Sequence, residues 1–439
     1  MFKGSRVFWP STLVAALTCL IVVPATASAA TTLWVAAKAP SAPFNSCEHP
    51  GYSHIEAALG GPGTAIHVCE GTYAEQLTIE RPVAISGYGK VTLELPAVTA
   101  NSATPCDKAS EEWFGLPEQD AISICGTAKV SIRNLNVDAV WPGEPVESGV
   151  SCAYSLNGIL VAGGADLELS NSTVTGARPQ LINGCQYGIG VQVGFTDTAT
   201  KALSTGTAEL SGDTIAGYQK NGITVEGPGS VASISKTTVT GAGPVAAIAQ
   251  NGIGVQFGAQ ATMTKDTVSG NECENPTCGP DALTQYQSVG VYFYEAGSGS
   301  SVSKSTLDSN DVGAEAFDST TADPSIAGDK LEGNRFEAVQ IGQGSASVER
   351  DVMRNSNVGI QLLQYAGQLY APGGTGTHDT IEDMGKWAVL GHSDDSGSDL
   401  AGSFSIANSR ISGNPGPRPY ESVESENPAK LKIYAEKDK

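Results

Sequence analysis

The chain has little positive charge. It contains 25 Lys and Arg against 46 Asp and Glu in 439 residues, which gives a formal net charge of −21 at pH 7. This balance repels nucleic acids and anionic membranes, so neither is expected as a partner. After residue 30 no segment is long and apolar enough to span a bilayer, which takes about 20 residues. Phosphate-binding loops, nucleotide fingerprints and Ser-His-Asp motifs are also missing from the sequence.

The sequence has no long apolar pattern at helical spacing, and it is rich in Gly, with 52 residues. Both features argue against a helical solenoid. What the chain has instead is a repeat, clearest in Asn-Gly-Ile-x-Val at residues 157–161, 221–225 and 251–255. Some fifteen residues later each repeat has a Ser/Thr/Asp-rich step that ends in one apolar residue: Val174, Val239 and Val268. A repeat of this length predicts a solenoid.

The repeat can be followed through nine corner positions. They are Gly158, Gly188, Gly222, Gly252, Gly290, Gly313, Ala338, Gly359 and Ala388. The shortest intervals, 21 to 25 residues, suit one turn of a three-sided coil, and the longer ones carry loop insertions. Within each turn, or rung, Ile and Val alternate with small or polar residues, so one face points inward. The pattern predicts an all-β parallel β-helix of about 11 to 12 rungs stacked at about 4.8 Å.

Residues 1–29 have the pattern of a signal peptide. Lys3 and Arg6 supply the positive charge, residues 11–23 the apolar segment, and Ala27-Ser28-Ala29 the cleavage site. The protein is therefore expected to be secreted and not inserted in a membrane once the signal is removed. Behind this segment we expect a cap with the first rungs at 30–92, the β-helix at 93–413 and a tail at 414–439. A short helix within 52–59 would cover the first rung, and residues 431–434 suit a terminal strand.

Removal of the signal peptide leaves eight of the nine cysteines, an even number that favours disulfides in an exported chain. In a coil that winds sequentially, neighbours in sequence are also neighbours in space. The expected pairs are Cys47–Cys69, Cys106–Cys125, Cys152–Cys185 and Cys273–Cys278. Zinc is disfavoured, because no second Cys or His pair accompanies the last of these.

One segment resembles a known family. Ile-His-Val-Cys-Glu-Gly-Thr-Tyr-Ala-Glu-Gln-Leu-Thr-Ile at 66–79, followed by Pro-Val-Ala-Ile-Ser-Gly at 82–87, is similar to the opening of pectin-lyase-like right-handed β-helix proteins, pectin methylesterases among them. The resemblance implies a right-handed coil. The catalytic motifs of the family are absent: Gln119-Asp120-Ala121-Ile122 only echoes the esterase motif, and Gly391-His392 with Asp394-Asp395 has the polygalacturonase motifs in the wrong order. No catalytic residue can be carried over.

The strand after each corner should present two outward columns of side chains. The first contains Leu160, Gly190, Thr224, Gly254, Tyr292, Glu315, Gln340, Gln361 and Leu390. The second contains Ala162, Gln192, Glu226, Gln256, Tyr294, Phe317, Gly342, Leu363 and His392. Aromatic rings and amides suit a neutral glycan, so we take Tyr292, Tyr294, Phe317, Gln192, Glu226 and Gln256 as a candidate glycan-binding face. The alternative is that Tyr and Phe simply favour exposed strands.

The outward columns argue against glycosidase chemistry. Glu226 and Glu315 would lie three rungs apart, about 14 Å along the axis. A glycosidase needs its two carboxyl groups about 5 to 9.5 Å apart. Neither column has a Lys or Arg to serve a lyase. Loops remain as an alternative source of catalytic groups.

A third column contains Asp329, Asp351 and Asp379 on consecutive rungs, about 4.8 Å apart. Stacked carboxylates repel one another unless a cation or backbone N–H groups neutralise them. Calcium bound through oxygen ligands is one possibility, and Asp side chains that cap a turn are the other. His49, His54 and His67 lie near Cys47 and Cys69, but their scattered spacing favours structural roles over copper or zinc.

Together these features predict a secreted, disulfide-tied right-handed β-helix that binds a glycan or a cell surface without catalysis. The alternatives are a polysaccharide lyase, hydrolase or esterase with loop-borne catalytic groups, and a structural rod of the cell envelope. No cofactor is firmly indicated, and calcium is the one that the sequence suggests.

Overall fold

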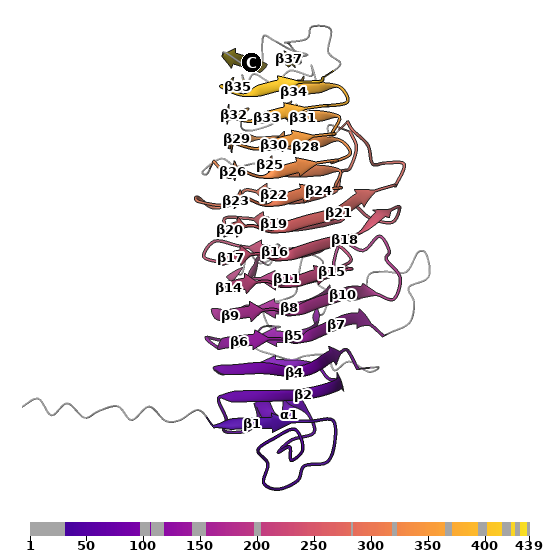
Figure 1. Cartoon of the computed structure of the whole chain (residues 1–439), viewed down its shortest axis with the longest axis vertical. Helices are drawn as coiled ribbons and strands as arrows, with labels where there is room; N and C mark the ends of the chain where they lie inside the picture. Colours follow the sequence, from indigo (N-terminus) through magenta and orange to yellow (C-terminus); the bar gives the residue numbers. More distant parts are fainter. Residues whose placement is uncertain are drawn as a thin grey trace, which may run out of the picture. The chain divides into compact units, whose positions relative to one another are not determined.

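The computed structural model describes residues 31–96, 106, 118–142, 155–196, 203–281, 284–317, 323–364, 371–393, 402–414, 423–425 and 431–436. The expected signal peptide at 1–29 lies outside these ranges. These described residues wind into a right-handed parallel β-helix whose rungs are stacked on one another (Figure 1). None of the helices in the described part of the chain has the length and apolar character needed to cross a membrane.

One side of the coil is sheet B, which contains twelve described strands in parallel register. In stacking order they are β3 (Leu77–Ile79), β5 (Glu118–Ile124), β8 (Ser155–Val161), β11 (Ile189–Val193), β16 (Asn221–Glu226), β19 (Asn251–Gln256), β22 (Val289–Tyr294), β25 (Val312–Phe317), β28 (Glu337–Ile341), β31 (Val358–Gln364), β34 (Trp387–Ser393) and β37 (Val423–Ser425).

The other two sides belong to sheet A. One side is built by β1 (Thr32–Val35), β2 (Ala65–Ala74), β4 (Val83–Glu94), β6 (Lys129–Arg133), β9 (Ala165–Ser170), β14 (Gly206–Ser211), β17 (Val231–Ser235), β20 (Gln260–Thr264), β23 (Ser301–Ser303), β26 (Ser325–Ala327), β29 (Gly344–Glu349), β32 (Pro372–Thr377), β35 (Gly402–Ala407) and β38 (Leu431–Glu436). The next side is built by the ends of β2 and β4 and by β7 (Asn136–Trp141), β10 (Thr173–Pro179), β15 (Thr214–Ala216), β18 (Thr238–Val245), β21 (Thr267–Cys273), β24 (Thr306–Asp308), β27 (Lys330–Glu332), β30 (Val352–Arg354), β33 (Thr380–Glu382) and β36 (Arg410–Ser412). The short strands β12 (Phe195–Thr196) and β13 (Leu203–Ser204) form an antiparallel pair.

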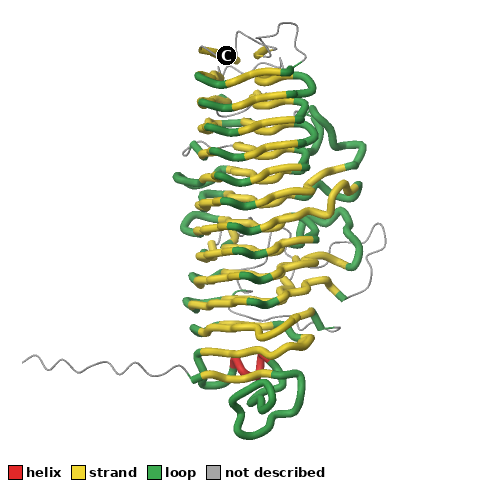
Figure 2. The backbone as a smooth tube through the Cα atoms, in the orientation of Figure 1, coloured by secondary structure: helices red, strands yellow, loops and turns green. Residues whose placement is uncertain are grey.

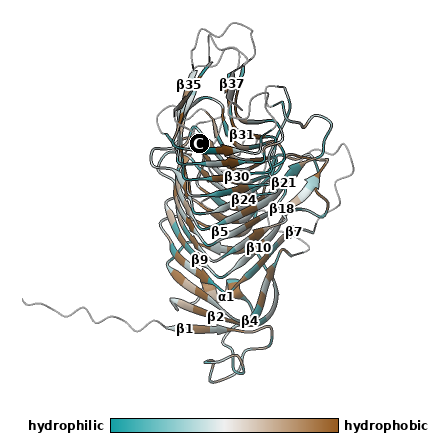
Figure 3. Ribbon diagram, turned by 45° about the horizontal axis from the view of Figure 1, so that its top comes forward, coloured by the Kyte–Doolittle hydropathy of each residue, from teal (hydrophilic) through white to brown (hydrophobic). Residues whose placement is uncertain are grey.

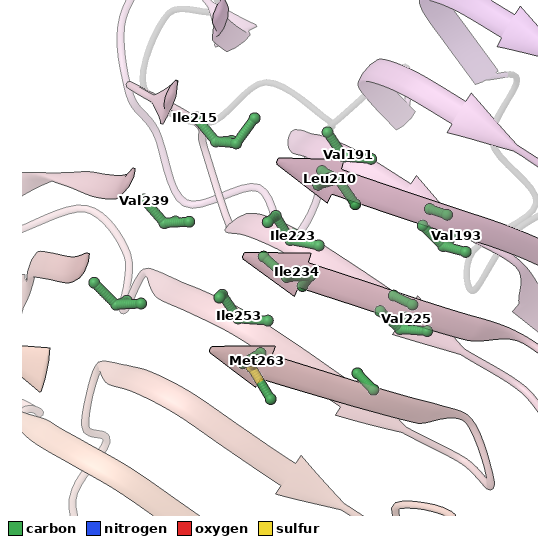
Figure 4. Packing of buried hydrophobic residues seen from close by; sticks show 14 of the residues in the cluster. Val191, Val193, Leu210, Ile215, Ile223, Val225, Ile234, Val239, Ile253 and Met263 are labelled. Carbon is green, nitrogen blue, oxygen red and sulfur yellow. The ribbon is translucent and has the colours of Figure 1, made fainter. Parts of the chain in front are cut away.

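The interior is a column of stacked aliphatic side chains. Ile223 on β16 pairs with Ile253 on β19, and both are fully buried. Leu210, Ile234 and Met263 reach the same interior from sheet A (Figure 4). Apolar residues recur along the rungs when the ribbon is coloured by hydropathy (Figure 3). The alternation along each strand therefore produces one continuous core, as the repeat predicts.

Tight corners join the two sides of sheet A. Between β17 and β18 the corner is Lys236-Thr237, where Lys236 has φ 54° and Thr237 is buried. The left-handed backbone turns the chain in two residues and points the second side chain into the coil. The longer loops instead gather on one side of the stack, around the ends of β18 and β21 (Figure 2).

The expected helix is α1 (Ile55–Leu59), which lies at the N-terminal edge of sheet B beside β3. Ile55, Ala58 and Leu59 are buried, and the carboxylate of Glu75 accepts hydrogen bonds from the first two backbone N–H groups of the helix at 3.0 and 2.9 Å. At the other end, β38 pairs with β35 and so adds the terminal strand.

Three of the expected cysteine pairs are disulfides in the structure: Cys47–Cys69, Cys106–Cys125 and Cys273–Cys278. Cys185 is also disulfide-bonded, and its expected partner Cys152 lies outside the described residues. Pairing between sequence neighbours follows from the sequential winding of the coil.

Candidate ligand-binding face

On one rung of the outer face of sheet B, the predicted columns are out of register with the structure. Gln192 pairs with Leu160 on one side and with Thr224 on the other, so it belongs to the first column and not beside Glu226. The Gly-Ile of residues 188–189 imitates the repeat, but the corner glycine is Gly190, because a side chain there would meet the backbone of Gly222. The columns therefore shift by two residues on this rung alone.

The N-terminal part of this face is covered. Leu160 and Ala162 are buried in a second apolar cluster together with Phe195 and the disulfide Cys106–Cys125. Gln192 is only 2% exposed, and its Nε2 donates to the carbonyl oxygen of Gly194. The expectation that Gln192 is exposed for glycan binding is therefore wrong, because a packed cluster and local hydrogen bonding occupy this end of the face.

The middle of the face contains a hydrogen-bonded network across β16, β19 and β22. Asn221 Nδ2 donates to Tyr292 Oη at 3.2 Å, and Tyr292 Oη donates to Gln256 Oε1 at 2.9 Å. Gln256 Nε2 then donates to Glu226 Oε2 at 2.8 Å. Glu226 is only 4% exposed, which differs from its expected exposure, while Gln256 and Tyr292 remain half-buried. The network places three of the predicted residues in one polar cluster.

Tyr292 lies across the neighbouring rung. A methyl group added at Gly254 would overlap the Tyr292 ring, so the ring covers this glycine and reaches Glu226 and Gln256. Burial raises the pKa of the Tyr292 hydroxyl above its usual range, and the charges of Glu226 and Glu315 add to this effect. The hydroxyl group therefore stays protonated well above neutral pH and keeps its hydrogen bond to Gln256.

Beside this network three aromatic side chains follow one another along the axis. The rings of Tyr294 and Phe317 are nearly parallel, 6° apart, with centroids at 5.7 Å. Phe257 meets Tyr294 edge to face at 5.4 Å. Phe317 extends over Gly342 on the following rung, where an added methyl group would overlap its ring. We call Phe257, Tyr294 and Phe317 the aromatic ladder.

Glu226 and Glu315 stand three rungs apart through β16, β19, β22 and β25, about 14 Å at ordinary strand spacing. The structure adds a third acid that the predicted columns leave out. Glu337 pairs with Val312 at the position that Asn251 and Asn221 occupy on earlier rungs, one residue before the corner. That equivalence with Asn was the only signal in the sequence for its outward placement.

The two acids on neighbouring rungs have perturbed ionisation. Burial raises the pKa of Glu315 to about 7. The hydrogen bond that Gln340 Nε2 donates to Glu315 at 3.0 Å acts in the opposite direction and lowers the pKa. Burial also raises the pKa of Glu337 well above its usual value, and the charges of Asp311 and Glu315 raise it further. Acidic groups with strongly raised pKa values are a recognised mark of functional sites.

Two amides continue the row beyond Glu315. Gln340 and Gln361 are 3% and 2% exposed, and the Oε1 atom of each is buried without a hydrogen-bond partner. Gln361 Nε2 lies 3.4 Å from His392 Nδ1. We call Glu315, Gln340 and Gln361 the acceptor row, because it runs on three consecutive rungs with more acceptors than donors.

A loop is anchored beside this row. Residues 273–288 include the disulfide Cys273–Cys278, and Asp311 Oδ2 accepts the N–H groups of both loop ends, Cys273 and Ser288, at 3.0 Å each. Arg335 pairs with Asp311 at 2.7 Å. Gln287 Nε2 donates to Glu337 Oε2 at 3.1 Å. The loop therefore shares its base with the acids of the face.

The predicted aspartate column points into the coil. Asp329 N–H donates to Asp351 Oδ1 at 2.6 Å, and Asp351 N–H donates to Asp379 Oδ1 at 2.9 Å. All three residues are at most 1% exposed. Burial raises the pKa values of Asp329, Asp351 and Asp379 to about 7, 9 and 7. Their carboxyl groups thus form a ladder of turn caps, which is the alternative to calcium.

Metal sites gain no support from the described residues, which contain no group of three or more His, Cys, Asp or Glu able to hold a metal ion. The three histidines have separate neighbours: Ser41 lies 3.3 Å from His49, Glu75 lies 3.4 Å from His54, and Tyr88 lies 3.3 Å from His67. Calcium binding at the aspartates therefore stays a prediction, and the described residues contain no cluster of ligands that supports it.

Comparison with known proteins identifies the family. The model of the "Right handed beta helix region" family matches residues 120–372. No curated protein matches the chain. Among solved structures, the Agl-KA catalytic domain has a TM-score of 0.55 at 13% identity, over 87% of this chain and 64% of that chain.

Two further solved structures have the same architecture. The complex of XylC with xylose has a TM-score of 0.52 at 10% identity, over 92% of this chain and 86% of that chain. The A-module of the mannuronan C-5 epimerase AlgE6 of Azotobacter vinelandii has a TM-score of 0.50 at 11% identity, over 87% and 93%. Likeness at these identities shows a common fold.

Proposed function

The chain belongs to the right-handed β-helix family, and we propose that it is an exported protein that binds a glycan along the outer face of sheet B without catalysis. The observation that carries the proposal is the aromatic ladder of Phe257, Tyr294 and Phe317 beside a row of amide and carboxyl groups. Aromatic rings give the C–H faces of a sugar an apolar platform, while the polar row bonds its hydroxyl groups.

Several properties support export and a glycan ligand. The disulfides suit an oxidising compartment. The net charge of −21 disfavours nucleic acid as a partner. The names of structures with the same fold refer to a xylose complex and to a mannuronan epimerase. The ladder spans consecutive rungs, so a chain of sugars laid along the axis would meet it repeatedly.

The test is binding of the purified protein to a panel of polysaccharides by affinity electrophoresis. Tyr294→Ala should weaken binding about tenfold, which corresponds to about 1.4 kcal/mol. The matched control is Tyr434→Ala on β38 of sheet A, an exposed Tyr on another side of the coil. Equal retardation of wild type and both variants would refute the proposed face, and no retardation by any glycan would favour a structural rod.

A second candidate function, a polysaccharide-active enzyme, is favoured by one observation. Glu315 and Glu337 lie on neighbouring rungs and both have raised pKa values, a condition that suits proton transfer near neutral pH. Incubation with the same polysaccharides, followed by assays for new reducing ends and for unsaturated uronate absorbance, separates the two functions. Turnover by the wild type that disappears in Glu315→Gln or Glu337→Gln would show that the protein is an enzyme and would refute the proposal of binding without catalysis.

A further inference from the structure

The proposed glycan-binding face is acidic, because it carries Glu226, Glu315 and Glu337. The central strands β16, β19, β22, β25, β28 and β31 contain no Lys or Arg. The neighbouring cations have other partners: Arg335 pairs with Asp311, and Lys220 Nζ donates to the carbonyl of Ala249 at 2.7 Å. Lys386 is exposed and acts electrostatically on Glu337.

The face also has an excess of hydrogen-bond acceptors. In the acceptor row, Gln340 Nε2 donates to Glu315. The Oε1 atoms of Gln340 and Gln361 are both buried without a hydrogen-bond partner. In the neighbouring network the hydroxyl of Tyr292 and the Nε2 of Gln256 are already used. Buried acceptors without donors are unfavourable, so a ligand that brings donors is preferred over one that brings acceptors.

The excess of hydrogen-bond acceptors lies beside the aromatic ladder, because Glu315 and Phe317 are on the same strand. Glu315 and Phe317 are two residues apart on β25, so their side chains leave the same face about 6.6 Å apart. Both are half-buried and remain partly accessible. A sugar ring against the ladder therefore has its substituents beside the carboxyl group of Glu315.

We propose that the preferred ligand of this face is a polysaccharide of amino sugars with free amino groups, whose ammonium group binds the half-buried carboxyl group of Glu315, beside the buried amides of Gln340 and Gln361, while its rings contact the aromatic ladder. The inference rests on the proposed function and names its ligand class. An ammonium group has three donors and no acceptor, and its charge-assisted bonds to carboxylates are the strong ones. An N-acetylated sugar lacks that charge, and a uronate adds like charge to Glu226 and Glu315.

Protons compete with the ammonium group for the same carboxyl groups. The groups that face Glu315 and Glu337 are Tyr292, Asp311 and Lys386, with Glu226 further along the network. Glu315 is protonated below its pKa of about 7, so affinity for an amino sugar should fall as the pH drops through this value. At high pH the ligand loses its own charge, and affinity therefore passes through a maximum.

The experiment is calorimetric titration of the purified protein with four oligosaccharides of equal length: glucosamine, N-acetylglucosamine, glucose and galacturonate oligomers. The glucosamine oligomer should bind about tenfold more tightly than the others near neutral pH. Glu315→Gln, which preserves shape, should remove this preference and leave the weaker binding of the neutral oligomers. The matched control is Glu168→Gln on β9 of sheet A, which removes an exposed charge from another face.

The outcomes separate the inference from the proposed function. Equal binding of glucosamine and glucose oligomers, both weakened by Tyr294→Ala, would overturn the amino-sugar inference and keep glycan binding on this face. If the preference for glucosamine falls equally in Glu315→Gln and Glu168→Gln, the preference comes from the overall negative charge of the protein, and the inferred site at Glu315 is refuted. No binding of any oligomer would refute the proposed function itself.

Discussion

Asp351 is the best position at which to test the ladder of buried aspartates. Its side chain is fully buried and accepts two backbone hydrogen bonds, from Asp329 at 2.6 Å and from Glu349 at 3.1 Å. Asp351→Ala removes both acceptors. A buried N–H group without a partner costs about 1 to 3 kcal/mol, so the variant should lose about 2 to 6 kcal/mol of the free energy of unfolding.

A graded control is already present in the same column. Ser305 and Ser409 occupy equivalent positions, and each Oγ accepts the N–H of the preceding rung, at 3.0 and 3.1 Å. Asp351→Ser should therefore keep the bond from Asp329 and lose the one from Glu349, at about 1 to 3 kcal/mol. The expected order of stability is wild type, then Ser, then Ala.

The assay is urea unfolding at neutral pH, with and without calcium and after treatment with a chelator. Calcium should leave the wild-type midpoint unchanged, because N–H groups occupy the carboxyl oxygens and burial raises the pKa of Asp351 to about 9. A loss below about 1 kcal/mol in Asp351→Ala would refute the ladder argument. Stabilisation of wild type by calcium, absent in Asp351→Ser, would show that the aspartates bind the ion.

Three other predictions concern the face and its supports. Gly342→Ala should displace the Phe317 ring and weaken glycan binding about fivefold, about 1 kcal/mol. Gly184→Ala, where the added methyl group makes only an ordinary contact with the Ala247 carbonyl oxygen at 3.6 Å, should not change binding. Asp311→Ala should loosen the loop at 273–288 and speed its proteolysis without changing the fold by circular dichroism, because both loop ends lose their acceptor. The aspartate ladder has raised pKa values of about 7 to 9, so its contribution to stability is greatest in acid and is lost as the pH rises through them. The thermal midpoint should therefore fall between about pH 6 and about pH 9, and a rise would contradict the protonated ladder.

Local periodicity accounts for what the sequence predicts correctly. Alternation along each strand places Ile223 and Ile253 in the core, and sequential winding places Cys273 beside Cys278 and stacks Asp329 on Asp351. These features need only neighbours along the coil. The same periodicity misplaces Gln192, because Gly188-Ile189 and Gly190-Val191 both match the start of the repeat, and only pairing with the adjacent strands selects the second.

The sequence by itself determined the coil and the alternation that separates inward from outward side chains along most of its strands. Tertiary structure decided which outward side chains are accessible and which are perturbed: Tyr292 covers Gly254, Cys106 and Phe195 pack in one cluster with Leu160, and Glu337 joins Glu315 from outside the predicted columns. The physical reason is that alternation fixes which way a side chain points, whereas burial and ionisation depend on what packs over it. Those partners come from other rungs and from inserted loops, whose positions the repeat does not encode.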